Sequence, residues 1–313
     1  MKKYIYYIVT LFFLQAVVGA CTDTEIYDTS DNSKGSQLKI VLNVPVDNAR
    51  TRGLVHGPDE DPTTSESVIN DVYVLAFNKA NNKYLGKFQP SMSNNTLIAS
   101  IDIEKIGTDE ITALVLTNLN SLENGSELVN KINQLTTGQT KEQLLKSLVY
   151  TFNNIWSVNE RPLPMWGETD ITPVKESTVT GTVNLYRAVS KINVTFNGGK
   201  QQLAGDNKTE IFKLKSVRVY YARTSGLAGS LHAPIANKEG GSDLIDTPSI
   251  PDEVNYFPRY KEDGTPNNLL FETTSEDGDY AIENQIYVPE SDQDQTDEPM
   301  CLVIGGYYMG SDK

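Results

Sequence analysis

The chain has 313 residues, with 27 Lys and Arg against 41 Asp and Glu, and its formal net charge is −14. This length is typical of two domains, and the acidic balance argues against nucleic acid as a partner, because phosphate binding depends on clustered Lys and Arg. Two Cys and two His cannot build a disulfide framework or a four-thiolate metal site, and they disfavour a His-based catalytic centre.

Residues 1–20 predict a lipoprotein signal peptide. A basic start, Met1-Lys2-Lys3, precedes a mostly apolar run that is shorter than a transmembrane helix normally requires. The following Gly19-Ala20-Cys21 resembles a bacterial lipobox, in which Cys21 is lipidated and becomes the mature N-terminus. The alternative is an ordinary signal peptide with a coincidental cysteine. We expect an outer-membrane lipoprotein precursor that touches the membrane only through this lipid.

Residues 21–52 read as an acidic tether and propeptide that contains one strand. Within residues 37–46, apolar side chains alternate with polar ones, which is the pattern of a strand with one buried face. Pro45 favours an edge position in the sheet, because proline cannot donate to the ladder. The expected buried face consists of Leu38, Ile40, Leu42, Val44 and Val46.

Residues 53–175 predict a β-sandwich domain with a small helical insert. Strands are expected at 71–77, 97–103 and 111–117, and the last is nearly all apolar, which indicates burial on both faces. Two short helices follow, one capped by Ser126 and one opened by the capping box Thr140 to Gln143. A domain boundary is expected near residues 171–176.

Residues 176–313 predict a second β-sandwich domain, so the fold class is mainly β. The apolar phase changes across residues 187–191, which indicates a bulge or a crossing between sheets, and a second phase slip follows Leu214. Long loops are expected over 222–268, and strands over 281–288 and 300–308. Cys301 lies in the last apolar run and is expected to be a buried, inert thiol.

The chain lacks the motifs of common enzymes. There is no Gly-x-Ser-x-Gly elbow, no phosphate-binding glycine loop and no His-Glu-x-x-His. The acidic runs at 59–61 and 290–298 lack the spacing of a calcium loop, and solvated loop charge is the better interpretation. We therefore expect no catalytic residue, no cofactor and no metal.

Arg50 and Arg52 are the candidate sites of proteolytic maturation. They lie in a polar segment directly after the expected strand, where an exposed loop would admit an Arg-specific protease. Arg52 is preferred because the unhindered Gly53 follows it, and Arg50 is second. The alternative interpretation is a charged turn between two strands. Cleavage would release the lipid, the tether and the whole strand together.

Loss of that strand would have a large energetic effect. Each buried aliphatic side chain contributes about 1.5–3 kcal/mol, so five contribute roughly 7–15 kcal/mol as an upper bound. This is comparable to the net stability of a whole domain. The resulting groove could be refilled by an extended segment of another chain, through strand addition. Because each subunit would join head to tail, the product would be an open filament.

The chain resembles the Bacteroidetes fimbrillins, the major and minor fimbrial subunits of Porphyromonas and Bacteroides. The resemblance rests on the lipobox at Cys21, the region of Arg50 and Arg52, and four segments: Val68–Phe77, Leu163–Glu168, Leu185–Ile192 and Ile286–Glu290. It implies two transthyretin-like β-sandwich domains, export as a lipoprotein and Arg-specific maturation. It also implies a donor strand from a neighbouring subunit and a cell-surface fimbria that supports adhesion.

The chain departs from this family pattern at its C-terminal end. Family members continue past the strand that resembles 300–308 into strands that supply the donor segment, whereas this chain ends at Lys313. This indicates a fragment, a truncated reading frame or a variant that accepts a strand without donating one, as a tip or accessory subunit would. The alternative function is a lipid-anchored β-sandwich that binds glycan or host protein, with Tyr220-Tyr221 and Tyr307-Tyr308 as candidate surface residues.

Overall fold

The structure is a computed structural model. It describes residues 36–43, 64–93, 96–101, 107, 109–151, 156, 161–173, 178–195, 200–202, 209–232, 249–253, 255–257, 269–273, 281–291 and 299–309. Cys21, Val44, Val46, Arg50 and Arg52 lie outside the described residues.

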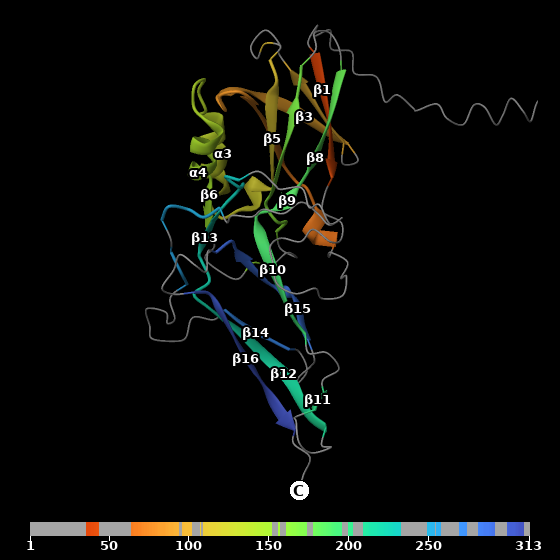
Figure 1. Cartoon of the computed structure of the whole chain (residues 1–313), viewed down its shortest axis with the longest axis vertical. Helices are drawn as coiled ribbons and strands as arrows, with labels where there is room; N and C mark the ends of the chain where they lie inside the picture. Colours follow the sequence, from red (N-terminus) through yellow and green to blue (C-terminus); the bar gives the residue numbers. More distant parts are fainter. Residues whose placement is uncertain are drawn as a thin grey trace, which may run out of the picture. The chain divides into compact units, whose positions relative to one another are not determined.

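An eight-stranded sheet forms the first half of the fold (Figure 1). Its order is β8-β1-β4-β3-β2-β5-β7-β9, and neighbouring strands are antiparallel except for β1 and β8. The strands are β1 (Ser36–Asn43), β2 (Val72–Asn78), β3 (Tyr84–Ser93), β4 (Thr96–Ile101), β5 (Ile111–Thr117), β7 (Met165–Ile171), β8 (Thr178–Asn184) and β9 (Tyr186–Arg187).

This sheet buries apolar side chains on both of its faces. In β5, Leu114 and Leu116 contribute to one core, whereas Ala113 and Val115 contribute to the other. Every residue of β5 is buried, which confirms the two-faced burial that its apolar run predicts. Two strands that follow residue 175, β8 and β9, belong to this sheet, so it draws on both sides of the expected domain boundary.

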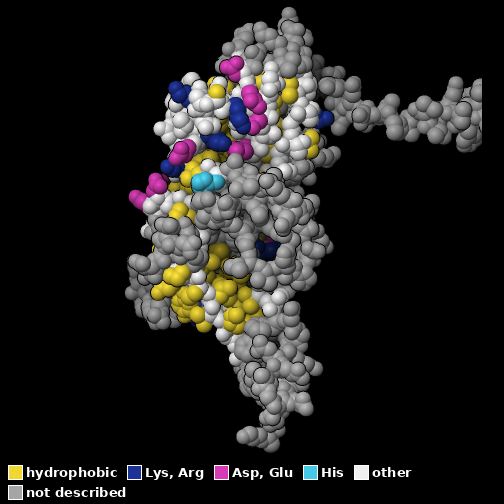
Figure 2. Space-filling model, in the orientation of Figure 1, with side chains coloured by type: hydrophobic (Ala, Val, Ile, Leu, Met, Phe, Trp, Pro, Cys, Tyr) yellow, Lys and Arg dark blue, Asp and Glu magenta, His cyan; other side chains and the backbone are white. Residues whose placement is uncertain are grey.

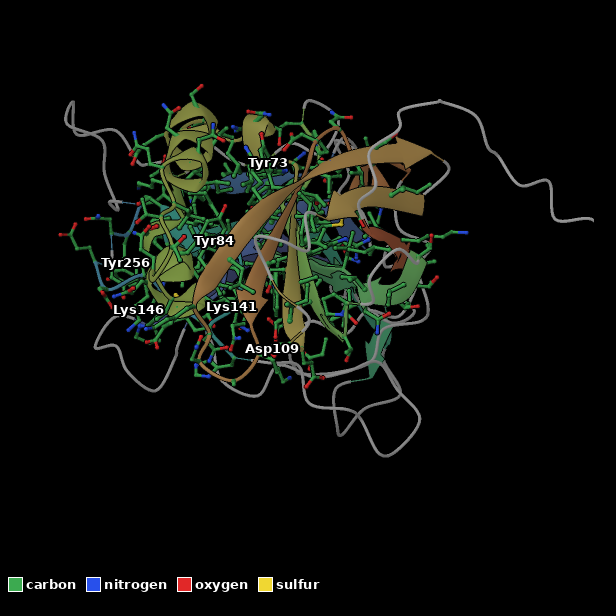
Figure 3. All side chains as sticks on the ribbon, turned by 90° about the horizontal axis from the view of Figure 1, so that it is seen from above. Tyr73, Tyr84, Asp109, Lys141, Lys146 and Tyr256 are labelled. Atoms are coloured by element: carbon green, nitrogen blue, oxygen red, sulfur yellow. The ribbon has the colours of Figure 1, made fainter. Side chains whose placement is uncertain are left out.

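A small helical layer covers one face of the sheet. It consists of α3 (Gly125–Asn133) and α4 (Lys141–Ser147), with the short helix η2 (Leu119–Ser121) and the strand β6 (Val149–Thr151). The short helix η1 (Thr64–Ser67) is not part of this layer, because its Glu66 contacts β9 and strands of the second half. Tyr73 and Tyr84 pack in the core between these helices and the sheet (Figure 3).

The two helix starts differ in how well the sequence predicted them. The capping box at α4 is confirmed, because the Thr140 hydroxyl accepts from the Gln143 N–H and the Gln143 side chain accepts from the Thr140 N–H. Ser126 is not the cap of α3, because the helix already begins at Gly125. A Cβ at Gly125 would lie 2.3 Å from the Leu119 carbonyl oxygen, so the backbone approach that positions this start requires glycine.

The second half of the fold is built from shorter sheets. β10 (Val189–Thr195) pairs with β15 (Ala281–Pro289), and β13 (Ser225–Leu227) pairs with β6. The long strand β12 (Thr209–Tyr220) has β16 (Cys301–Met309) on one side, and β11 (Lys200–Gln202) and β14 (Leu270–Glu272) on the other. Their shared core includes Leu214, Val217, Phe271 and Ile286.

Both predicted phase changes are confirmed. The chain leaves the eight-stranded sheet after β9 and enters the β10–β15 sheet, which explains the change over residues 187–191. The register of β12 against β16 shifts between Leu214 and Ser216, which is the bulge that the second slip indicates. With mixed sheets and short helices, the mainly β fold class is confirmed.

The prediction that Cys301 is buried is wrong, because its side chain is exposed. It lies at the start of β16, where Val303 and Ile304 are also 50% and 43% exposed. Figure 2 shows hydrophobic side chains gathered at the surface over the region of β14 and β16. An apolar run predicts a strand correctly here, but burial also requires a second layer over that strand.

Candidate functional site

The strand β1 lies inside the sheet rather than at its edge. It pairs antiparallel with β4, from Ser36 opposite Ile101 to Val41 opposite Thr96. It also pairs parallel with β8, from Gln37 opposite Thr178 to Asn43 opposite Asn184. The edge position that Pro45 favours is therefore wrong for this strand. Apolar alternation reports which face is buried, but the strands on either side come from distant parts of the chain.

The buried face of β1 belongs to the core of the sheet. Ile40 is 0% exposed and Leu42 is 3% exposed, and both pack in the cluster that includes Val74, Leu97 and Val183. Lys39, which precedes Ile40 and lies on the opposite face of the strand, is exposed. The backbone of Leu38 lies opposite Ala99 of β4 and Val179 of β8.

The strand β8 is held in place by more than its pairing with β1. A Cβ at Gly167 of β7 would lie 2.2 Å from the Asn184 carbonyl oxygen, and a Cβ at Gly181 of β8 would lie 3.1 Å from the Ile171 Cδ1. These close approaches pack β8 directly against β7. On the other side of β1, β4 is paired with β3. Each of the two strands that flank β1 is therefore also held by a strand other than β1.

The Glu66 cluster joins η1 to β9 of the eight-stranded sheet and to two strands of the second half. The Glu66 carboxylate is 1% exposed and lies 3.1 Å from the Lys191 Nζ of β10 and 3.8 Å from the Arg187 Nη2 of β9. The Tyr287 hydroxyl of β15 donates to it at 2.6 Å. Burial first, and then this contact with Glu66, raise the pKa of the Tyr287 phenol, so it stays protonated as the donor.

The Glu66 cluster matters because of its place in the sequence. Glu66 follows the expected cleavage positions Arg50 and Arg52, so it belongs to the segment that cleavage would leave on the protein. Its buried ion pairs hold the beginning of that segment against β9, β10 and β15. Sequence reasoning missed this cluster, because Thr64-Ser65-Glu66-Ser67 reads as an ordinary polar loop.

A second polar node explains why two of the fimbrillin-like segments lie together. Asn118 is buried in the left-handed conformation, with φ of 60°. Its amide nitrogen donates to the carbonyls of Val68 and Leu163, at 2.8 and 2.7 Å, and its side-chain oxygen accepts from the Asn70 N–H at 2.8 Å. Asn118 therefore fastens the start of β2 to the segment before β7.

A metal site and a membrane-spanning helix find no support in the described residues. Among them, no group of three or more His, Cys, Asp or Glu is placed to hold a metal ion. None of the described helices has the length and apolar character that crossing a membrane requires. His232 lies in a loop after β13, and His56 lies outside the described residues. The arrangement around β1 is thus the best candidate for a functional site.

Comparisons with known proteins agree with this fold. The family model for fimbrillin-A associated anchor proteins Mfa1 and Mfa2 matches residues 32–300. No curated protein sequence matches the chain. A solved structure of a candidate cell adhesion protein from Parabacteroides distasonis ATCC 8503 is similar, with 13% identity and a TM-score of 0.50, covering 88% of this chain and 78% of that chain.

Two further solved structures are similar. One is a candidate cell adhesion protein from Bacteroides eggerthii DSM 20697, with 16% identity and a TM-score of 0.49, covering 91% of this chain and 78% of that chain. The other is a fimbrilin (fimA) from Porphyromonas gingivalis W83, with 14% identity and a TM-score of 0.44, covering 87% of this chain and 71% of that chain.

Proposed function

The chain belongs to the family of fimbrillin-A associated anchor proteins Mfa1 and Mfa2, and from this premise we propose that it is a fimbrial subunit that matures by exchange of β1. In this proposal the chain is exported as a lipoprotein through Cys21 and is cut by an Arg-specific protease after Arg52 or Arg50. A strand from a neighbouring subunit then takes the place of β1 in a cell-surface fimbria that supports adhesion. The role is structural and not enzymatic.

The observation that carries the proposal is the double pairing of β1. Its removal would leave unpaired N–H and C=O groups on both β4 and β8, together with an opening where Ile40 and Leu42 lie. Burial of those two side chains alone contributes about 3–6 kcal/mol, and unpaired ladder groups add to the cost of leaving the space empty. A groove of this kind strongly favours an incoming strand.

The walls of the groove also define the strand that fits it. The incoming strand must run parallel to β8 and antiparallel to β4, as β1 does. It must present apolar side chains at every second position, to fill the places of Ile40 and Leu42. Because β7 supports β8 and β3 supports β4, the groove can keep its shape while it is empty.

Limited proteolysis of the folded full chain tests the cleavage step. We expect an Arg-specific protease to give a new N-terminus at Gly53 or Thr51, read by N-terminal sequencing. A double variant, Arg50→Gln with Arg52→Gln, is the control and should stay intact under the same conditions. Cleavage at Arg161 or Arg187 in the fold instead, or no cleavage of the native chain, would contradict the proposal.

A second candidate function is that of an anchor, which the description of the matching family favours. An anchor would keep its lipid and its own β1 and would hold the base of a fimbria. The two roles differ in the mature N-terminus recovered from cells. A lipid-modified Cys21 on most of the assembled protein would support the anchor, and Gly53 or Thr51 would support the exchanging subunit.

A binding module that acts without polymerising is the remaining alternative. It would show saturable glycan or host-protein binding by the intact monomer. Oligomer ladders that persist in detergent after cleavage would instead support strand exchange between subunits.

A further inference from the structure

The two strands that flank β1 end at different places along it. On the side of β8 the pairing continues to Asn43, which lies opposite Asn184. On the side of β4 it ends at Val41, which lies opposite Thr96. Thr96 is the first residue of β4 and already pairs with Ser93 of β3, because the β3–β4 hairpin reverses there. Within the described residues, positions 42 and 43 of β1 are therefore paired with β8 alone.

The opposite end of β1 is held on both sides. Gln37 already lies opposite Ser100 of β4 and Thr178 of β8. From Gln37 to Val41, each residue of β1 is paired with both neighbouring strands. β1 therefore opens more easily at its last residues than at its first, because fewer backbone pairings must break there.

The end of β8 that carries this single pairing is firmly held. Val183 is 0% exposed, whereas Val179, nearer the start of β8, is only partly buried. A Cβ at Gly167 of β7 would lie 2.6 Å from the Val183 Cγ1 and 2.2 Å from the Asn184 carbonyl oxygen. β9 follows in the chain and also pairs with β7. Residues 182–184 therefore keep their place against β7 when the end of β1 moves away.

The same end offers one apolar position to an incoming strand. Leu42 is 3% exposed, lies opposite Val183, and packs in the core cluster that also contains Leu185. A strand that places one apolar side chain there gains pairing with β8 and burial of that side chain in a single step. Cleavage after Arg50 or Arg52 would free this end of β1, while the start of β1 would stay joined to the tether.

We propose that residues 182–184 of β8 are the surface on which the strand of a neighbouring subunit first docks. This inference rests on the exchange of β1 proposed above and gives that exchange a direction. The incoming strand runs parallel to β8, so its C-terminal residues bind first, with an apolar side chain in the place of Leu42. Pairing then proceeds towards Thr178 and displaces β1 residue by residue.

The concentration dependence of exchange tests this order of events. The full chain is cut with an Arg-specific protease and mixed with an isotope-labelled peptide that carries residues 36–46, and native mass spectrometry follows uptake with time. Docking before release predicts an uptake rate proportional to peptide concentration, and faster loss of the chain's own segment when peptide is present. An uptake rate that does not depend on peptide concentration would show that β1 leaves first, and would overturn the inference.

Two variants of the peptide locate the first contact without altering the folded chain. Leu42→Ala in the peptide should slow uptake about tenfold, because it weakens the contact that forms first. Ile40→Ala is the matched control, since its place lies between β4 and β8 and fills later. It should change the uptake rate by less than about twofold and speed dissociation about tenfold. Equal slowing by both variants, or the reverse pattern, would contradict docking at residues 182–184.

Hydrogen exchange of the uncleaved chain tests the same asymmetry without any exchange of strands. The amides of Leu42 and Asn43 should exchange, on average, about tenfold faster than those of Ile40 and Val41. Equal protection along β1 would overturn the inference. Uptake that occurs without concentration dependence refutes the docking order alone, whereas no uptake of any peptide refutes the exchange of β1 and this inference with it.

Discussion

The strands β1 and β16 both carry apolar side chains, yet they differ in how many strands they pair with and in how deeply those side chains are buried. β1 is paired on both sides and buries Ile40 and Leu42 completely or nearly so. β16 pairs with β12 alone among the described strands, and Val303 and Ile304 are about half exposed. Losing β1 therefore opens a two-walled groove in a core, whereas β16 offers a single free edge. The groove specifies its occupant far more strongly than the edge does.

Ile40→Asp should have the largest effect and tests the contrast directly. It places an unpaired carboxylate in the core and removes aliphatic packing, so we expect a loss of roughly 5 kcal/mol or more of unfolding free energy. The same change on β16, Val303→Asp, should cost less than about 1 kcal/mol because that side chain is exposed. Urea denaturation of both variants measures the difference. Equal losses in the two variants would show that β1 is no more deeply packed than β16.

Glu66→Gln should have the next largest effect. It removes the charge that Lys191 and Arg187 face and weakens the acceptor of the Tyr287 hydroxyl. We expect a loss of about 3 kcal/mol in urea denaturation. Lys146→Gln, which breaks an exposed pair with Glu142 on α4, is the control and should leave the urea midpoint essentially unchanged.

Glu66→Gln also tests whether the Glu66 cluster holds the segment after the cleavage positions. If Glu66 holds the segment that remains after cleavage, Glu66→Gln should make that segment more accessible to a non-specific protease. Unchanged stability and unchanged accessibility would show that η1 is held by other contacts.

Gly167→Ala should have a moderate effect, because it acts on one wall of the groove. The added Cβ would lie 2.2 Å from the Asn184 carbonyl oxygen, so β8 would have to move away from β7. We expect a loss of about 2 kcal/mol by urea denaturation. Gly138→Ala is not a suitable control, because Gly138 has φ of 105° and would add backbone strain.

The smallest expected effect is the contribution of Asp170 of β7 to the pH dependence of the unfolding free energy. Burial raises the pKa of its carboxyl, but hydrogen bonds from Lys79 and Thr112 outweigh burial and lower it overall. The unfolded chain then binds more protons, so this contribution is present above the ordinary pKa of 3.8 and is lost as pH falls below it. Asp170→Asn should flatten the acid limb of the stability curve.

Asp71 provides a control of opposite sign. Burial raises the pKa of its carboxyl more than the backbone hydrogen bonds of Asn120 and Leu119 lower it. Its contribution to stability is therefore largest below pH 3.8 and is lost as pH rises through the raised pKa. Changes of the same sign in Asp170→Asn and Asp71→Asn would contradict these assignments.

The sequence predicted local patterns better than it predicted neighbours. The strand at β5, the capping box at Thr140 and both phase changes follow from residues close together in the chain, and the structure has all of them. The interior position of β1 depends on β4 and β8, which lie far along the chain. The exposure of Cys301 has the same cause, because an apolar run cannot report whether a second layer covers it.

The buried charged side chains Glu66 and Arg223 were the hardest features to predict from the sequence. Glu66 meets Lys191 and Tyr287 only after η1 and two strands of the second half come together. Arg223 lies in a segment rich in loop-forming residues, and its burial comes from distant aromatic residues such as Phe271. Each is a long-range contact, and neither leaves a periodic or spaced signature in the sequence.

The most direct test of the account is strand exchange in the cleaved chain. The chain is cut with an Arg-specific protease and incubated with an isotope-labelled peptide that carries residues 36–46, and native mass spectrometry follows the bound species. The account predicts a folded cleaved chain that takes up one labelled peptide in place of its own segment, and no uptake by the uncleaved Arg50→Gln, Arg52→Gln variant. A cleaved chain that unfolds, or that stays folded without taking up peptide, would contradict it.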